Sequence, residues 1–148
     1  MSIVIILLAI VILVALTFEY INGFHDSANA IATAVSTKVL TPRTAVLYGA
    51  ALNVIGAFSG THVAETISKG ILNVDNTTQV VILCALLGAI IWNLITWFYG
   101  IPSSSSHALI GGLLGASIAK AGFSIVNVEG VTKKVLIPMI TSPILGLV

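Results

Sequence analysis

Four consecutive serines and a histidine, residues 103–107, carry the strongest chemical signal in the sequence. They lie between two segments apolar enough for a lipid bilayer, where a hydroxyl must be satisfied by protein or by a bound ligand. Pro102 before the run and a small-residue pattern after it are typical of a helix N-terminus that a serine caps. A helix start with hydroxyls and free amides is suited to bind an oxyanion.

Within this run we expect the hydroxyls of Ser104, Ser105 and Ser106 to bind the anion, together with backbone amides up to His107. The His107 side chain is either a titrating group or only a hydrogen-bond donor. The alternative interpretation is a flexible polar turn at the membrane surface. A catalytic Ser–His pair is not expected, because the G-x-S-x-G setting and any strand pattern are missing.

A second polar group begins at Asp26. If a helix starts after Asp26, then Asn29, Thr33 and either Ser36 or Thr37 follow at steps of three or four and share one face of that helix. Carboxylate, amide and hydroxyl oxygens are the ligands that a hard cation prefers, so the stripe predicts a cation or proton site. The alternative is that Asp26 caps the helix while the others only contact a neighbouring helix.

The composition places the chain among integral membrane proteins. Of its 148 residues 57% are hydrophobic and only 7% are charged, against about 25% charged residues in soluble domains. Mean hydropathy is +1.13. The net charge of +1 gives no reason to expect a nucleic-acid partner. The single cysteine, Cys84, cannot form an internal disulfide and lies in an apolar run.

Five apolar segments occur in the sequence: residues 3–20, 44–60, 80–99, 107–121 and 135–148. The first three are long enough for membrane-spanning helices, the fourth is too short, and the fifth is cut off at Val148. Residues 3–37 are too long for one span, because 35 residues at about 1.5 Å each exceed a bilayer core of about 30 Å. We therefore expect a broken first helix, with the break at Asn22–Gly23. Residues 102–121 are short for a span and predict a half-helix or one arm of a re-entrant hairpin.

The basic residues favour the re-entrant path. If residues 99–121 dip into the membrane and return, five basic residues lie on one side of the membrane and Lys69 alone lies on the other. The N-terminus is then extracytoplasmic. If that segment crosses the membrane instead, two basic residues lie on one side and four on the other. The sequence stops within an apolar segment, so we expect one membrane domain, residues 1–148, truncated in its last helix.

Together the two polar groups resemble the inorganic phosphate transporter (PiT) family. Four stretches match the family's motifs in order and spacing, and the resemblance covers nearly the whole chain: residues 22–30 (NGFHDSANA), 36–43 (STKVLTPR), 65–70 (ETISKG) and 100–112 (GIPSSSSHALIGG). The family consists of two inverted repeats that each contribute an Asp/Asn helix break and a serine-rich hairpin to a central phosphate site. This sequence matches the first repeat. Some members have a glutamate near the position of Asn53, so details of coupling do not transfer.

The resemblance implies an all-α, polytopic transporter of the plasma membrane, or its first half, that moves inorganic phosphate together with Na⁺ or H⁺. Phosphate would be bound by Ser104, Ser105, Ser106, His107 and Asn29, and the coupling cation by Asp26, Asn29 and Thr33. Na⁺ at Asp26 and Asn29 would be the only metal, with no other cofactor. A second repeat or a second copy of the chain would complete the site. The alternatives are a sulfate permease and a membrane subunit without transport activity.

Overall fold

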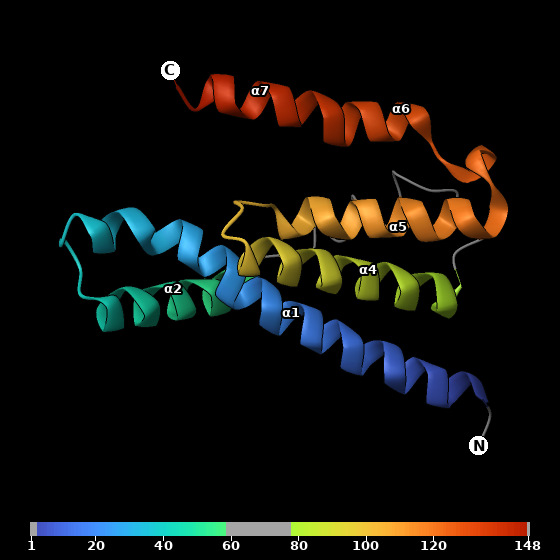
Figure 1. Cartoon of the computed structure of the whole chain (residues 1–148), viewed down its shortest axis with the longest axis horizontal. Coiled ribbons are helices and arrows are strands. Elements are labelled where there is room, and N and C mark those ends of the chain that lie inside the picture. Colours follow the sequence, from blue (N-terminus) through green and yellow to red (C-terminus); the bar gives the residue numbers. More distant parts are fainter. Residues whose placement is uncertain (1–2, 59–77, 148) are drawn as a thin grey trace.

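The computed structural model describes residues 3–58 and 78–147, and these residues fold into helices (Figure 1). The long helices are α1 (Ile3–Ser36), α2 (Pro42–Ala57), α4 (Gln79–Phe98) and α5 (Ser105–Ala121). A shorter group follows: η2 (Phe123–Ile125), α6 (Val128–Val131), the π-helical stretch η3 (Thr132–Leu136) and α7 (Ile137–Leu145). The expected all-α class is confirmed. The motif at residues 65–70 and Lys69 within it lie outside the described residues.

α1 is one continuous helix of 34 residues, so the break predicted at Asn22–Gly23 is wrong. Gly23 does not adopt the positive φ angle found at Gly100 and Gly122. A glycine inside a helix costs about 1 kcal/mol relative to alanine, and the unbroken hydrogen bonds of the helix offset that cost. α1 ends instead before Lys38, whose φ of 61° is the left-handed conformation common at helix C-termini.

The length of α1 has a consequence for its position in a membrane. At about 1.5 Å per residue the helix is about 51 Å long, against a bilayer core of about 30 Å. Asp26 is an interior residue of this helix rather than its cap, so the alternative capping role is wrong. Polar residues in the second half of α1 therefore lie about one bilayer thickness from its N-terminal end.

α2 runs back beside the second half of α1 (Figure 1). Its start is capped by Thr41, whose hydroxyl accepts a hydrogen bond from the N–H of Thr44 at 3.3 Å. Pro42 occupies the first turn, where its missing N–H leaves no partner unsatisfied. Ala45 is buried, whereas most of the large apolar side chains of α2 are exposed.

α4 and α5 form an antiparallel helical hairpin whose turn holds the serine run (Figure 1). The two backbones come close at Gly112, where an added Cβ would collide with the carbonyl group of Ala85. The first half of α1 packs on α4, and a buried apolar core joins the helices at Val11, Phe18, Leu86 and Ala89. Leu109, one turn after Ser105 on α5, also packs against this core.

A hairpin formed within residues 99–121 alone is not found. α5 is a single helix that returns along α4, and the Nζ of Lys120 near its end donates to the hydroxyl of Thr78, the cap of α4, at 3.3 Å. The other arm of the hairpin is therefore α4, which the sequence predicted as a separate span. Lys120 therefore lies beside the beginning of α4, and the five-to-one division of basic residues across a membrane stays a prediction.

The C-terminal group packs on α5 through Ile125 and Val135, which are buried against Leu113 and Leu114. Among the described residues, α1 and α4 are long and apolar enough to cross a membrane. Large apolar side chains are exposed over several helices, for example Leu13 at 67% and Leu47 at 71% of full exposure. Apolar surface of this extent is typical of contact with lipid or with another protein. The fold agrees with a membrane protein.

Candidate functional site

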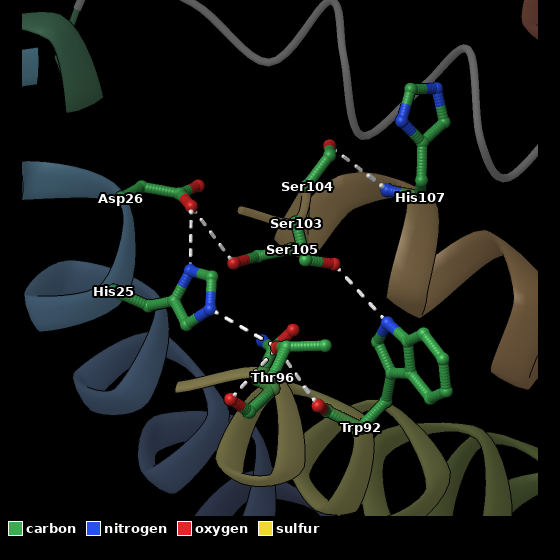
Figure 2. A network of polar contacts seen from close by, with 9 residues as sticks. His25, Asp26, Trp92, Thr96, Ser103, Ser104, Ser105 and His107 are labelled. Carbon is green, nitrogen blue, oxygen red and sulfur yellow. Dashed lines mark hydrogen bonds and ion pairs between the residues drawn. The ribbon is translucent and has the colours of Figure 1, made fainter. Parts of the chain in front are cut away.

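The two polar groups predicted from the sequence meet where the hairpin turn contacts α1. Figure 2 shows the contact, in which the hydroxyl of Ser105 donates a hydrogen bond to Oδ1 of Asp26 at 3.1 Å. Ser105 is the first residue of α5 and is only 1% exposed. Asp26 lies on α1 and keeps 46% of its side chain exposed. Residues 79 positions apart in the sequence therefore share one carboxylate oxygen.

His25 joins the same cluster from α1. Its ring is buried, with 6% exposure, between α1 and α4. Nδ1 lies 3.3 Å from Oδ1 of Asp26, and Nε2 lies 3.2 Å from the hydroxyl oxygen of Thr96. Oδ1 of Asp26 is thus in contact with both the Ser105 hydroxyl and the His25 ring (Figure 2). These two neighbouring residues of α1 thus link the hairpin turn, through the carboxylate of Asp26, to α4, through the ring of His25.

The four serines of the turn have different roles. Ser103 accepts a hydrogen bond from Nε1 of Trp92 at 3.1 Å, which ties the turn to α4. Ser104 caps α5, because its hydroxyl accepts from the N–H of His107 at 3.3 Å. The hydroxyl of Ser106 is exposed. The expected helix start at the serine run is confirmed, and the amide of His107 is engaged by the cap.

The remaining predicted ligands are not all brought to this cluster. The exposed ring of His107 points away from Asp26 (Figure 2). Asn29 lies one turn beyond His25 and lines a hollow of about 170 Å³ with His25, Thr96 and the turn. Thr33 lies a further turn along α1, where its carbonyl accepts from the hydroxyl of Thr37 at 2.7 Å. Of the predicted set, the structure joins Asp26 to Ser105 and places Asn29 in a hollow with His25.

A larger hollow of about 650 Å³ lies between α1 and α2. Asp26 lines it, so the carboxylate stands between this hollow and the hairpin turn. Several polar residues that the sequence did not assign also line it: Glu19, Asn22, Ser27, Tyr48 and Asn53. Two carboxylates and several amide and hydroxyl groups give this hollow an acidic, hydrogen-bonding wall on α1.

Three polar residues of the cluster were not predicted as site residues: His25, Asn93 and Thr96. Asn93 is fully buried, and within the described part of the chain its amide nitrogen and oxygen both lack a hydrogen-bond partner. A buried unpaired polar group costs about 1–3 kcal/mol, so its retention calls for a reason. The sequence did offer a signal, since Asn93 and Thr96 are polar residues three positions apart in an apolar helix.

The hydrogen-bonding groups of the cluster are suited to bind and release a small anion. Hydroxyl groups and N–H groups of the first turn of a helix can donate to an anion, and a carboxylate can accept from a protonated ligand. Among the described residues, no group of three or more His, Cys, Asp or Glu side chains is placed to hold a metal ion. What the geometry offers is a polar junction of three helices beside two hollows.

Comparison with known proteins agrees with these motifs. The sequence pattern of the family described as "Phosphate transporter family" matches residues 22–148. A Bacillus subtilis protein named "Probable low-affinity inorganic phosphate transporter" is 54% identical over an alignment of 151 residues. The alignment covers 100% of this chain and 45% of that protein. Relatives with the same name are 51% identical in Streptomyces halstedii (95% of this chain, 66% of that protein) and 56% identical in Rhizobium meliloti (86% and 38%). The chain therefore spans less than two thirds of the length of each of these relatives. No solved structure matches it.

Proposed function

Because this chain belongs to the phosphate transporter family, we propose that it moves inorganic phosphate across the plasma membrane as part of a cation-coupled, multi-pass secondary transporter. The family consists of transporters, not enzymes. The observation that carries the proposal is the hydrogen bond between Ser105 and Asp26, which brings the serine run and the acidic stripe of α1 into one site. A second repeat or a second copy of the chain completes that site.

In this proposal the α4–α5 hairpin re-enters the membrane and presents its serine turn to phosphate. Ser104, Ser105 and Ser106 with the free amides of α5 hold the anion, while Asn29 and His107 contribute from the two sides of the turn. Asp26 binds the coupling cation, Na⁺ or H⁺, together with Asn29 and Thr33 further along the helix. The hollow between α1 and α2, which Asp26 lines, gives water and ions access to its carboxylate.

In this proposal Asp26 also makes the site select phosphate over sulfate. Phosphate near neutral pH retains at least one hydroxyl, which donates a hydrogen bond to a carboxylate, whereas sulfate has no proton to donate and is repelled. We therefore expect phosphate uptake to resist excess sulfate.

The test is uptake of radiolabelled phosphate into proteoliposomes that contain the assembled transporter, with Asp26→Asn as the first variant. The substitution removes the carboxylate at almost constant volume, so we expect coupled uptake to fall at least tenfold while membrane insertion is retained. Sulfate in tenfold excess should inhibit Asp26→Asn more strongly than wild type.

Glu19→Gln is the matched control, because Glu19 lines the same hollow as Asp26 but makes no hydrogen bond to the hairpin turn in the described structure. Its effect on uptake should be several-fold smaller. Normal coupled uptake by Asp26→Asn would remove Asp26 from the transport mechanism, and wild-type vesicles that take up no phosphate would reject the proposed function itself.

A further inference from the structure

Asn93 differs from the other buried polar residues of the junction. Its side chain is 0% exposed, and within the described part of the chain both its amide nitrogen and its amide oxygen lack a hydrogen-bond partner. Thr96 and Ser105, each 1% exposed, are both hydrogen-bonded. An amide that is buried without a partner destabilises the arrangement that buries it. Its two polar atoms are therefore left for a partner that this arrangement of the helices does not supply.

The side chain of Asn93 lies on the face of α4 that packs against α1 and α5. Ala85, Ala89, Asn93 and Thr96 follow one another at steps of three or four, and all four are buried. In the described residues this face contacts α1 on one side and α5 on the other. Asn93 thus lies between the apolar core, which includes Ala89, and the polar contact of Thr96 with α1.

Asn93 is level with the start of α5. Ala108 and Leu109 of α5 pack against the apolar core to which Ala89 belongs. Because α4 and α5 are antiparallel (Figure 1), one turn further along α4 corresponds to one turn nearer the start of α5. One turn after Ala89 is Asn93, and one turn before Ala108 and Leu109 is the serine turn at Ser105. The unpaired amide therefore faces the same level of the structure as the first turn of α5.

A side-chain amide can pair with both kinds of oxygen on hydrogen phosphate. Its NH₂ group donates and its oxygen accepts, whereas phosphate near neutral pH has unprotonated oxygens that accept and at least one hydroxyl that donates. N–H groups in the first turn of a helix add donors for the unprotonated oxygens, and in α5 the cap at Ser104 engages one of them, that of His107. Sulfate has no hydroxyl and would leave the amide oxygen unpaired.

We propose that Asn93 is a further phosphate-binding residue, which the anion reaches when the hairpin turn moves away from α1. Nδ2 donates to an unprotonated oxygen of phosphate, and Oδ1 accepts from its hydroxyl. The inference rests on the proposed function. It adds to the proposed site a residue that is neutral, fully buried and outside the serine run.

Two contacts hold α4 and the hairpin turn against α1 at this level. The hydroxyl of Ser105 donates to Asp26, and Nε2 of His25 lies 3.2 Å from the hydroxyl oxygen of Thr96. When these contacts part, water and the anion reach Asn93. Phosphate then stabilises the open arrangement, because it pairs with an amide that the closed arrangement leaves unpaired. The unpaired amide also lowers the free energy needed for opening, since it destabilises the closed arrangement alone.

The experiment measures the affinity for inorganic phosphate and the thermal unfolding of the purified, assembled transporter, for wild type, Asn93→Leu and Asn93→Ser. Leucine keeps the branched shape of asparagine without a hydrogen-bonding group, whereas serine is smaller but keeps a donor and an acceptor. Phosphate affinity should fall at least tenfold in Asn93→Leu and only several-fold in Asn93→Ser. A role in packing alone predicts the reverse order, because leucine fills the space of asparagine better than serine does.

Ser117→Ala is the matched control. Ser117 is 1% exposed, and its hydroxyl also lacks a partner among the described residues. It lies on the same hairpin but far from the turn, near the other end of α5. Ser117→Ala removes a buried unpaired group in the same way, so it should unfold no earlier than wild type and should bind phosphate with wild-type affinity.

Wild-type phosphate affinity in Asn93→Leu would overturn the inference, and so would a lower affinity in Asn93→Ser than in Asn93→Leu or an equal loss in Ser117→Ala. If Asn93→Leu does not fold, Asn93→Ser decides alone, and wild-type affinity in that variant rejects the inference. Failure of the proposed function gives a different result, since wild type itself would then bind no inorganic phosphate.

Discussion

Ser105 and Ser106 are neighbours in the sequence with different surroundings in the structure. Ser105 is buried and donates to Asp26, whereas the side chain of Ser106 is exposed. A hydrogen bond to a charged group contributes about 1.5–3 kcal/mol and one between neutral groups about 0.5–1.5 kcal/mol. The hydroxyl of Ser105 therefore holds the hairpin turn against α1, whereas the exposed side chain of Ser106 is accessible to a ligand.

This difference makes Ser105→Ala and Ser106→Ala a matched pair. Ser105→Ala should lower both the thermal stability of the detergent-purified protein and its affinity for phosphate. Ser106→Ala should lower phosphate affinity several-fold and leave the melting temperature unchanged. Both are measured by phosphate binding and thermal unfolding of the same samples. An unaltered phosphate affinity in Ser106→Ala would take Ser106 out of the proposed site.

Among the elements, the α4–α5 hairpin depends on one close approach of two backbones. An added Cβ at Gly112 would collide with the carbonyl of Ala85, whereas at Gly115, one turn later on α5, nothing lies within 4 Å. Both residues are glycines inside the same helix. The sequence contains both, but only the packing of α5 on α4 distinguishes them.

Gly112→Ala and Gly115→Ala should therefore act in opposite directions. Overpacking at Gly112 costs about 1–3 kcal/mol, so the helices must separate and the turn must shift relative to Asp26. Alanine at Gly115 should stabilise α5 by about 0.5–1 kcal/mol, the usual difference within a helix. Thermal unfolding gives the sign of each change, and phosphate uptake should fall for Gly112→Ala alone. Equal effects of the two substitutions would contradict the close approach.

On the scale of the whole molecule, the serine turn lies partway along a structure that is longer than a bilayer core. The start of α2 and the end of α5 lie at opposite ends of the long axis (Figure 1). Asp26 is ten residues before the end of α1, which corresponds to about 15 Å along the helix axis. A membrane that covers both halves of α1 would therefore place the hairpin turn below both of its surfaces.

Labelling of introduced cysteines tests this placement. In a Cys84→Ala background, Arg43→Cys and Ala121→Cys should react with a membrane-impermeant thiol reagent from opposite sides of the membrane. Ser103→Cys should react slowly from either side, because the turn lies below both surfaces. Arg43→Cys and Ala121→Cys labelled from the same side would instead support the return within residues 99–121 that the basic residues predicted.

Taken alone, the sequence determined the membrane class, the helical fold, the helix start at Ser104–Ser105 and the two polar groups. These features depend on local composition and on capping residues, which act over one or two helical turns. The tertiary structure decided that α1 continues through Asn22–Gly23, that α4 is the second arm of the hairpin, and that His25 and Thr96 join the site. The physical reason is that these outcomes depend on contacts between residues far apart in the chain, such as Gly112 with Ala85 and Ser105 with Asp26, which periodicity and spacing do not contain.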